Sequence, residues 1–308
     1  MHWGARMNLA MVQSLTAVAV LAALPVAAQS TPPAMRDSAA FDHDGTAHIT
    51  RVMPVPATIS PEAQKWLESL THKPSGGQTL AQRRAAIEQW RSFAAAEAKR
   101  HYPVAIEPST IAGVRTDVIT PLAMPAAVDD VIAVYRELLK TYKPQSIGIY
   151  GTSAGAILTC KVAVKLKQLG LPLPAALGVF SGLGDFSRVG ESRQLFRVDG
   201  FPGDLAPTDP DHLPDDAYVG NTDRRDPSLS PLFADWRGMP PSLLLTSTRD
   251  LLLSDTSLLH RAMLHAGVDA QLIVFEALPQ AFWHHFEFPE TREALELMAA
   301  FLDQKVAH

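Results

Sequence analysis

Apolar residues in this 308-residue chain form short unbroken runs that alternate with stretches of helical spacing. The short runs predict buried strands at Ser146–Tyr150, Ala175–Phe180, Ser242–Thr246 and Ala270–Phe275. The longer stretches predict helices at 127–139, 156–165, 251–266 and 289–306. Because strand and helix alternate, we predict an α/β class with a mainly parallel sheet, in which these four strands are neighbours in that order.

The N-terminal residues have the pattern of a signal peptide. Arg6 supplies a positive charge, Leu9 to Leu24 is largely apolar, and Val26-Ala27-Ala28 places small residues at a cleavage point. The apolar stretch is short for a membrane span. We therefore expect residues 1–28 to be removed on export, so that the mature protein is secreted or periplasmic and has no stable membrane span. A retained N-terminal anchor is the alternative.

The region before the first predicted strand divides into two parts. Residues 29–59 are rich in Pro, Ser, Thr and Ala and predict a poorly ordered lead-in. Residues 60–102 predict two helices, since Ser60-Pro61-Glu62 has the form of a helix start and Thr79 to Gln82 that of a capping box. The two helices either cap a site on the domain at 60–308 or only pack against it.

Charge and cysteine content exclude several kinds of partner. The net charge is −5 and there is no basic run, which argues against nucleic acid as a partner. Cys160 is the only cysteine, so neither an intrachain disulfide nor zinc-ligand spacing is present. We expect no metal or other cofactor, and composition leaves homo-oligomerisation open.

One pentapeptide carries a chemical signature. Gly151-Thr152-Ser153-Ala154-Gly155 lies between a predicted strand and a predicted helix, the setting of a nucleophile elbow. The glycines leave room for a sharp turn that exposes Ser153, and the N–H of Ala154, at the helix N-terminus, can face a developing oxyanion. A solvent-facing turn serine in a chance match is the alternative.

Further segments resemble the α/β-hydrolases of the hormone-sensitive-lipase-like group, in their Gly-Thr-Ser-Ala-Gly branch. The similarity covers roughly residues 60–305, and besides the pentapeptide it rests on segments 125–130, 226–232, 239–241 and 248–252. The resemblance implies an α/β-hydrolase fold. It also implies a carboxylic-ester hydrolase, esterase- or lipase-like, that acts on small acyl or lactone substrates.

The same resemblance assigns roles to individual residues. Ester hydrolysis by this route needs a nucleophile, a histidine that accepts its proton and an acid that orients the histidine. The resemblance makes Ser153 the nucleophile and Asp250, in Thr248-Arg249-Asp250-Leu251-Leu252, the acid. Asp185, which follows the preceding predicted strand, is the reserve acid. An N-cap for the helix beginning near Leu251 is the alternative role for Asp250.

At the third position the chain departs from the family. Leu278-Pro279-Gln280-Ala281-Phe282 resembles the family's Pro-His-x-Phe loop, but Gln280 stands where the histidine is expected. Glutamine cannot carry a proton near neutral pH. His284 and His285 follow, and His284-His285-Phe286 repeats the His-x-Phe spacing. A displaced loop would make His284 the base, whereas the alternative leaves both histidines on the surface.

The second departure is a missing segment. The family has a strand, a His-Gly-Gly oxyanion loop, a helix and another strand where this chain has only Thr120 to Met124, and His-Gly-Gly occurs nowhere in it. The family's loop supplies an oxyanion N–H, and one of its strands lies beside the elbow strand. We therefore expect the elbow strand to become an edge or to find a new neighbour.

Three interpretations follow from these departures. Loss of a triad histidine costs on the order of a millionfold in kcat in subtilisin. The first interpretation is an esterase that uses Ser153, Asp250 and a displaced His284. The second is a non-catalytic binding protein on a hydrolase scaffold, as in the plant gibberellin receptors that resemble this family. The third is an internally deleted, non-functional product.

Overall fold

The computed structural model describes residues 38–43, 47–50, 55–69, 110–111, 114–115, 124–200 and 219–306, with isolated positions between 81 and 100. The chain divides into two units, residues 1–54 and 55–308. In the first unit, β1 (Ser38–Phe41) pairs antiparallel with β2 (Ala47–Thr50). This hairpin lies in the predicted lead-in. All of β1 is exposed, which explains why no apolar pattern marks it.

One prediction in this part of the chain, the signal peptide, remains untested. The predicted signal peptide, residues 1–28, lies outside the described residues. The first predicted cap helix is present as α1 (Pro61–Ser69), and the isolated positions described between 81 and 100 are helical. No helix in the described ranges has the length and apolar character that a membrane crossing requires.

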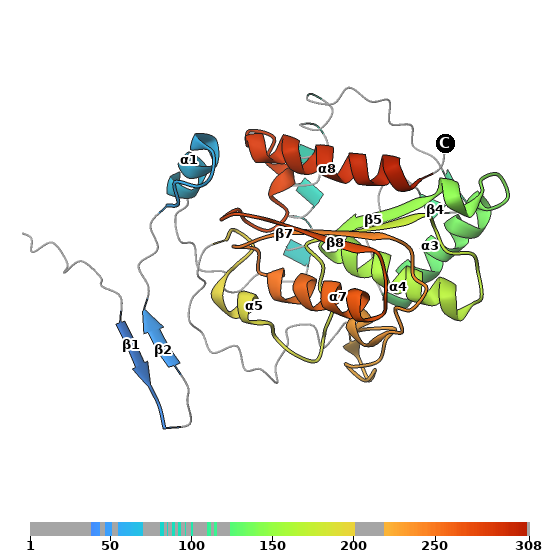
Figure 1. Cartoon of the computed structure of the whole chain (residues 1–308), viewed down its shortest axis with the longest axis horizontal. Coiled ribbons are helices and arrows are strands. Elements are labelled where there is room, and N and C mark those ends of the chain that lie inside the picture. The colour runs from blue at the N-terminus through green and yellow to red at the C-terminus, as the bar shows by residue number, and fades with distance from the viewer. Residues whose placement is uncertain are drawn as a thin grey trace, which may run out of the picture. The chain divides into compact units, whose positions relative to one another are not determined.

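The second unit contains a four-stranded sheet whose strands all run parallel (Figure 1). The strands in spatial order are β5 (Gly148–Thr152), β6 (Ala176–Phe180), β7 (Ser242–Ser247) and β8 (Ala270–Phe275). This order confirms the prediction. The register pairs Tyr150 with Gly178, and Gly178 with Leu243. Because all four strands are parallel, the loops after their carboxyl ends gather at one edge of the sheet.

The predicted helices are also present, with ends that differ by at most three residues. They are α3 (Met124–Leu138), α4 (Ala154–Gln168), α7 (Leu253–His265) and α8 (Pro289–Lys305). The shorter elements are β3 (Thr110–Ile111), β4 (Val114–Arg115), α5 (Glu191–Leu195) and the 3-10 turns η1 (Pro144–Ser146), η2 (Pro231–Phe233) and η3 (Phe282–His284). The α/β class is therefore confirmed.

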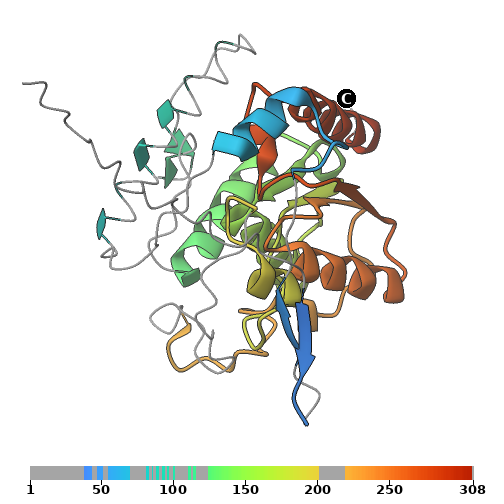
Figure 2. The same cartoon turned by 90° about the vertical axis from the view of Figure 1, so that its left-hand side faces the viewer.

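Helices cover both faces of the sheet. In Figure 1, α8 lies above the sheet and α4 and α7 lie below it, and Figure 2 shows α7 and α8 on opposite sides. Side chains of α4 and α7 pack against one face of β6 and β7, and α3 packs against α4. This is the layered arrangement that a parallel sheet with helical crossovers requires.

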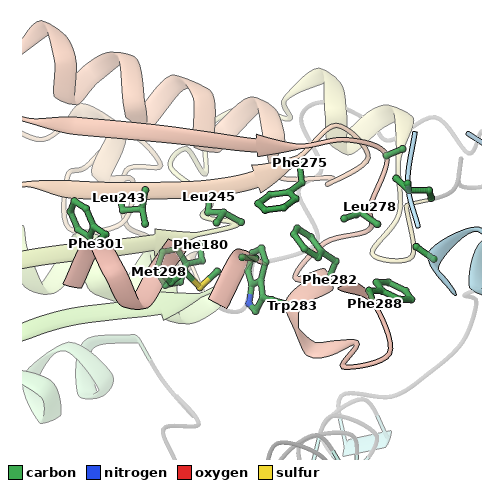
Figure 3. Close-up of a cluster of buried hydrophobic side chains, with 14 of the residues drawn as sticks. Phe180, Leu243, Leu245, Phe275, Leu278, Phe282, Trp283, Phe288, Met298 and Phe301 are labelled. Carbon is green, nitrogen blue, oxygen red and sulfur yellow. The ribbon is translucent and has the colours of Figure 1, made fainter. Parts of the chain in front are cut away.

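A largely aromatic core fixes the segment between β8 and α8. Phe282, Trp283 and Phe288 from this segment pack with Phe180 of β6 and with α8, as Figure 3 shows. Helix α1 adds buried Ala63 and Leu67 to the same cluster, and the N–H of Ser60 donates to Glu290 Oε1 at 2.6 Å. The segment that follows β8 is thus held on a buried, well-packed base.

Strand β5 is an end strand of this sheet. In the part of the chain that the structure describes, its hydrogen-bonded neighbour is β6 alone. Its central residue, Tyr150, is 64% exposed, whereas every residue of β6 and β7 is buried. The expectation that the elbow strand becomes an edge is met within the described residues.

Candidate active site

Ser153 sits on a strained turn between β5 and α4. Its backbone has φ 55° and ψ −117°, and its N–H donates to the carbonyl of Phe180 at 2.9 Å. A non-glycine residue rarely adopts a positive φ unless the surroundings enforce it. Gly151 permits this close turn, since a Cβ there would lie 2.3 Å from the carbonyl carbon and oxygen of Gly155. This is the geometry of a nucleophile elbow.

Ala154 is the first residue of α4. The first N–H groups of a helix have no partner within the helix, and the helix dipole makes that end favourable for negative charge. The N–H of Ala154 is therefore suited to stabilise an oxyanion on an acyl group attached to Ser153. That role stays a prediction.

Asp250 lies at the same edge of the sheet as Ser153, because both follow the carboxyl ends of parallel strands. Its side chain is fully buried and accepts three hydrogen bonds. The donors are the Ser181 hydroxyl, the Thr246 hydroxyl at 2.7 Å and the Leu252 N–H at 2.8 Å. Burial raises the pKa of this carboxyl, and the three donors oppose the rise.

The N-cap interpretation of Asp250 is wrong in its simple form. The N-cap residue of α7 is Leu252, which makes no side-chain cap bond. Asp250 instead lies two residues before Leu252 and accepts the N–H of Leu252, as aspartate does in local turns. Its Oδ1 thus stabilises the turn that leads into α7, while its Oδ2 accepts the hydroxyls of Ser181 and Thr246.

Gln280 is the side chain that reaches Ser153. Its amide Nε2 donates to Ser153 Oγ at 3.1 Å. Three residues later, Trp283 Nε1 donates to Thr152 Oγ1 at 3.2 Å. Gln280 lies two residues before η3 and Trp283 lies within it, and the segment around this turn places both side chains against the elbow. The loop after β8 therefore brings a side chain to Ser153, and that side chain is an amide.

The two nearby histidines are half-buried, and the side chain of His285 is 28% exposed. Burial, with a smaller contribution from His285, lowers the pKa of His284 from 6.5 to about 4. The ring of His285 stacks on Phe288 at 4.9 Å between centroids and meets the edge of Trp66 at 4.8 Å. The alternative that leaves both histidines on the surface is met only in part, since both side chains keep some exposure. His285 is a packing residue, and the role of His284 as a base stays a prediction.

The reserve acid, Asp185, is engaged in its own loop. Its Oδ1 accepts the N–H of Ser187 at 2.7 Å and the Ser187 hydroxyl at 2.6 Å. Behind it, buried Asp255 of α7 accepts the N–H groups of Gly184 and Asp185 at 3.3 and 3.4 Å. Burial raises the pKa of Asp255 to about 6. These contacts favour Asp250 over Asp185 as the acid at this edge.

Sequence reasoning missed Ser181, Thr246 and Trp283. Ser181 is the first residue after β6, the strand between those that carry Ser153 and Asp250. The sequence signal that could have identified Ser181 as a partner of Asp250 is a hydroxyl side chain directly after β6. Thr246 lies four residues before Asp250, and nothing in the sequence pattern marked it as a partner.

The described residues hold no group of three or more His, Cys, Asp or Glu side chains that could bind a metal ion. A cavity of about 460 Å³ lies between the loop after η3 and the start of α8. It is lined by Phe286, Glu287, Phe288, Pro289, Thr291, Arg292 and Glu296. None of the residues around Ser153 takes part, so this cavity is separate from the candidate site.

Comparison with known proteins supplies the context for this geometry. A family model described as the alpha/beta hydrolase fold matches residues 122–284. An acetyl-hydrolase of Streptomyces hygroscopicus is 34% identical over 183 residues, which are 58% of this chain and 59% of that protein. An esterase of Acinetobacter venetianus is 29% identical over 190 residues, 58% of each. The chain thus spans less than two thirds of these curated relatives.

Solved structures agree with this result. The crystal structure of an esterase, E25, matches with a TM-score of 0.70 and 27% identity, covering 84% of this chain and 98% of that one. An esterase from the bacterial hormone-sensitive lipase family matches with a TM-score of 0.52 and 33% identity, covering 60% and 62%. These similar proteins are thus an acetyl-hydrolase and esterases.

Proposed function

Because the chain belongs to the family with the α/β hydrolase fold, we propose that it is a serine esterase that acts on small acyl or lactone esters. Ser153 is the nucleophile and Asp250 the acid. The observation that carries the proposal is the strained turn at Ser153 with the Gln280 side chain 3.1 Å from its Oγ. An elbow serine approached by the loop after the last strand is the arrangement of a hydrolase triad.

The proposed chemistry begins at the serine hydroxyl. Ser153 Oγ attacks the ester carbonyl, and the Ala154 N–H stabilises the oxyanion that forms. The Gln280 amide donates to Oγ and orients it, but an amide does not accept the hydroxyl proton near neutral pH. General base catalysis typically contributes about a hundred- to ten-thousandfold. The wild-type protein should therefore turn over slowly.

Labelling with a fluorophosphonate probe tests the nucleophile. The folded wild-type protein should be labelled, and Ser153→Ala should not. Gln280→His should be labelled faster, because the imidazole can accept the serine proton. If neither the folded wild type nor folded Gln280→His reacts, the chain is not a serine esterase.

The identity of the base is tested with two matched histidine variants. His284 is the candidate that the shifted-loop hypothesis names, and the stacked His285 is its control. Hydrolysis of p-nitrophenyl acetate should be equally slow in wild type, His284→Ala and His285→Ala if the base is absent. Loss of activity in His284→Ala alone would identify His284 as the base.

A second candidate function is non-catalytic binding of an ester or lactone. The hydrogen bond from Gln280 favours it, since a donor amide at this position binds the serine without activating it. Calorimetric titration with a non-hydrolysable ketone analogue tests this function. Saturable binding together with failure of all phosphonate labelling would favour the binding protein over the esterase.

We further propose that the protein is exported, supported by the charged, apolar and small-residue pattern of residues 1–28. N-terminal sequencing of the protein recovered from a secreting host should begin after Ala28. A start at residue 1 in a membrane fraction would favour the retained anchor instead.

A further inference from the structure

We propose that Ser153 is a stable acylation site, which accepts one acyl group from an activated ester and retains it. The inference rests on the proposed role of Ser153 as nucleophile and goes beyond it. Esterases normally form and then hydrolyse such an acyl-serine. In this chain the groups around Ser153 support the first of these steps better than the second.

The first step needs little proton transfer when the leaving group is weakly basic. The Ser153 Oγ–C bond forms, the C–O bond of an aryl ester or the C–S bond of a thioester breaks, and the serine proton is lost to water and is available to the departed phenolate or thiolate. A phenolate or a thiolate leaves without first being protonated. The strained turn and the N–H of Ala154 remain available to this step. Removal of a triad member leaves about a thousand- to ten-thousandfold catalysis over water where the oxyanion hole and binding are intact, and the N–H of Ala154 is the proposed part of that hole in this chain.

The second step lacks these advantages. Water must attack the acyl carbon, lose a proton, and expel the Ser153 alkoxide, which is a much poorer leaving group. Both events call for a group that accepts a proton and then donates it. The group held against Oγ is the Gln280 amide, which does neither near neutral pH. Its N–H can bond the ester oxygen of the acyl-serine but cannot activate water.

The acid does not compensate for the missing base. Asp250 is fully buried, and its oxygens accept bonds from Ser181, Thr246 and Leu252. In a working triad the acid orients and stabilises the charged histidine rather than taking the proton itself. With an amide at position 280 there is no imidazolium for it to stabilise.

These steps define the class of acyl donor. The donor carries a small acyl group and a weakly basic leaving group, as an aryl ester or a thioester does. Alkyl esters and lactones should acylate Ser153 much more slowly, because an alkoxide must be protonated as it leaves and the Gln280 amide held against Oγ does not donate a proton near neutral pH.

Intact-protein mass spectrometry of the wild type after exposure to p-nitrophenyl acetate tests the inference. The expected result is one acetyl group per chain, released slowly after excess reagent is removed, and none on Ser153→Ala. Continuous release of p-nitrophenol with no adduct would overturn the inference while leaving the esterase proposal intact. Absence of both adduct and turnover would overturn both.

The lifetime of the adduct provides the matched comparison. Gln280→His should shorten it by about a hundred- to ten-thousandfold, the contribution typical of a general base. Gln280→Asn, which keeps the amide, should not shorten it. An adduct that is lost equally fast from wild type and from Gln280→His would overturn the inference. If neither variant folds, the wild-type adduct and its absence from Ser153→Ala still decide the question.

Discussion

The two strands that carry the proposed nucleophile and acid differ in how firmly the fold holds them. Strand β7 lies inside the sheet, all six of its residues are buried, and it ends near a carboxylate with three donors. Strand β5 lies at the end of the sheet in the described part of the chain, and its central Tyr150 is 64% exposed. Ser153 follows the exposed strand and Asp250 the buried one.

Asp250 and Gln280 also differ in how much of the fold depends on them. Asp250 satisfies buried polar groups on three segments, so its loss would damage the fold as well as the chemistry. Gln280 makes its contact with Ser153 from a loop whose packing is carried by its neighbours Phe282 and Trp283. A change from histidine to glutamine there alters proton transfer and leaves the core intact.

The largest effect on stability is expected for Asp250→Ala. The substitution leaves two buried hydroxyls and one buried N–H without their acceptor, at about 1 kcal/mol or more for each. We expect urea denaturation to show a loss of roughly 3 kcal/mol in the free energy of unfolding. Asp250→Asn keeps an acceptor and should lose less. Equal stability of wild type and Asp250→Ala would remove the distinction between the two strands.

The buried carboxyl of Asp255 on α7 should make the free energy of unfolding depend on pH. Burial raises its pKa from 3.8 to about 6, against the attraction of Arg193. Between these values the folded protein holds a proton that the unfolded chain has lost, so stability falls as pH rises, by about 3 kcal/mol in all.

Asp255→Asn should abolish this dependence. Its carboxamide oxygen can still accept the N–H groups of Gly184 and Asp185. The readout is the difference between the unfolding curves of wild type and variant from pH 4 to 7. The difference is needed because His284, whose pKa is lowered to about 4, gives the opposite slope below pH 6.5. Parallel profiles for the two proteins would contradict the prediction.

The turn at Ser153 should be closely packed although β5 lies at the end of the sheet. Alanine substitutions at its two glycines test this. A Cβ at Gly151 would lie 2.3 Å from backbone atoms of Gly155, so Gly151→Ala should cost about 1–3 kcal/mol. A Cβ at Gly155 would meet no atom within 4 Å. Gly155→Ala lies in α4 and should stabilise by about 0.5–1 kcal/mol. Thermal unfolding of both variants measures the two changes in stability. Equal losses of stability in Gly151→Ala and Gly155→Ala would refute the prediction.

The sequence predicted the elements better than it predicted their contacts. The four strands of the main sheet and the helices around them are marked by their own apolar patterns, so their type and order were confirmed. The hairpin of β1 and β2 was missed because its exposed strand has no such pattern. Ser181 was missed because its hydrogen bond to Asp250 joins residues 69 positions apart, which no local pattern records.

The contact of Gln280 with Ser153 could be anticipated only through the family resemblance, which placed residue 280 at the position of the base. Spacing alone could not choose between Gln280 and His284, because both lie in the short segment around the 3-10 turn η3, Gln280 just before it and His284 at its end. The direction of that turn decides which side chain faces the elbow. It is set by the packing of Phe282 and Trp283 in the core.

The smallest effect is expected at Tyr150, the most exposed residue of β5. Its ring lies 6.1 Å from that of Phe180 and is otherwise largely in solvent, so Tyr150→Thr should change the free energy of unfolding by less than about 0.5 kcal/mol. Threonine keeps a good strand former at the edge. Leu244 on β7, which is fully buried, is the matched control, and its truncation to alanine should cost about 2–5 kcal/mol. Urea denaturation of Tyr150→Thr and Leu244→Ala measures the two losses in the free energy of unfolding. A loss at Tyr150 comparable to that at Leu244 would mean that β5 is covered in solution, and the contrast between the two strands would then fail.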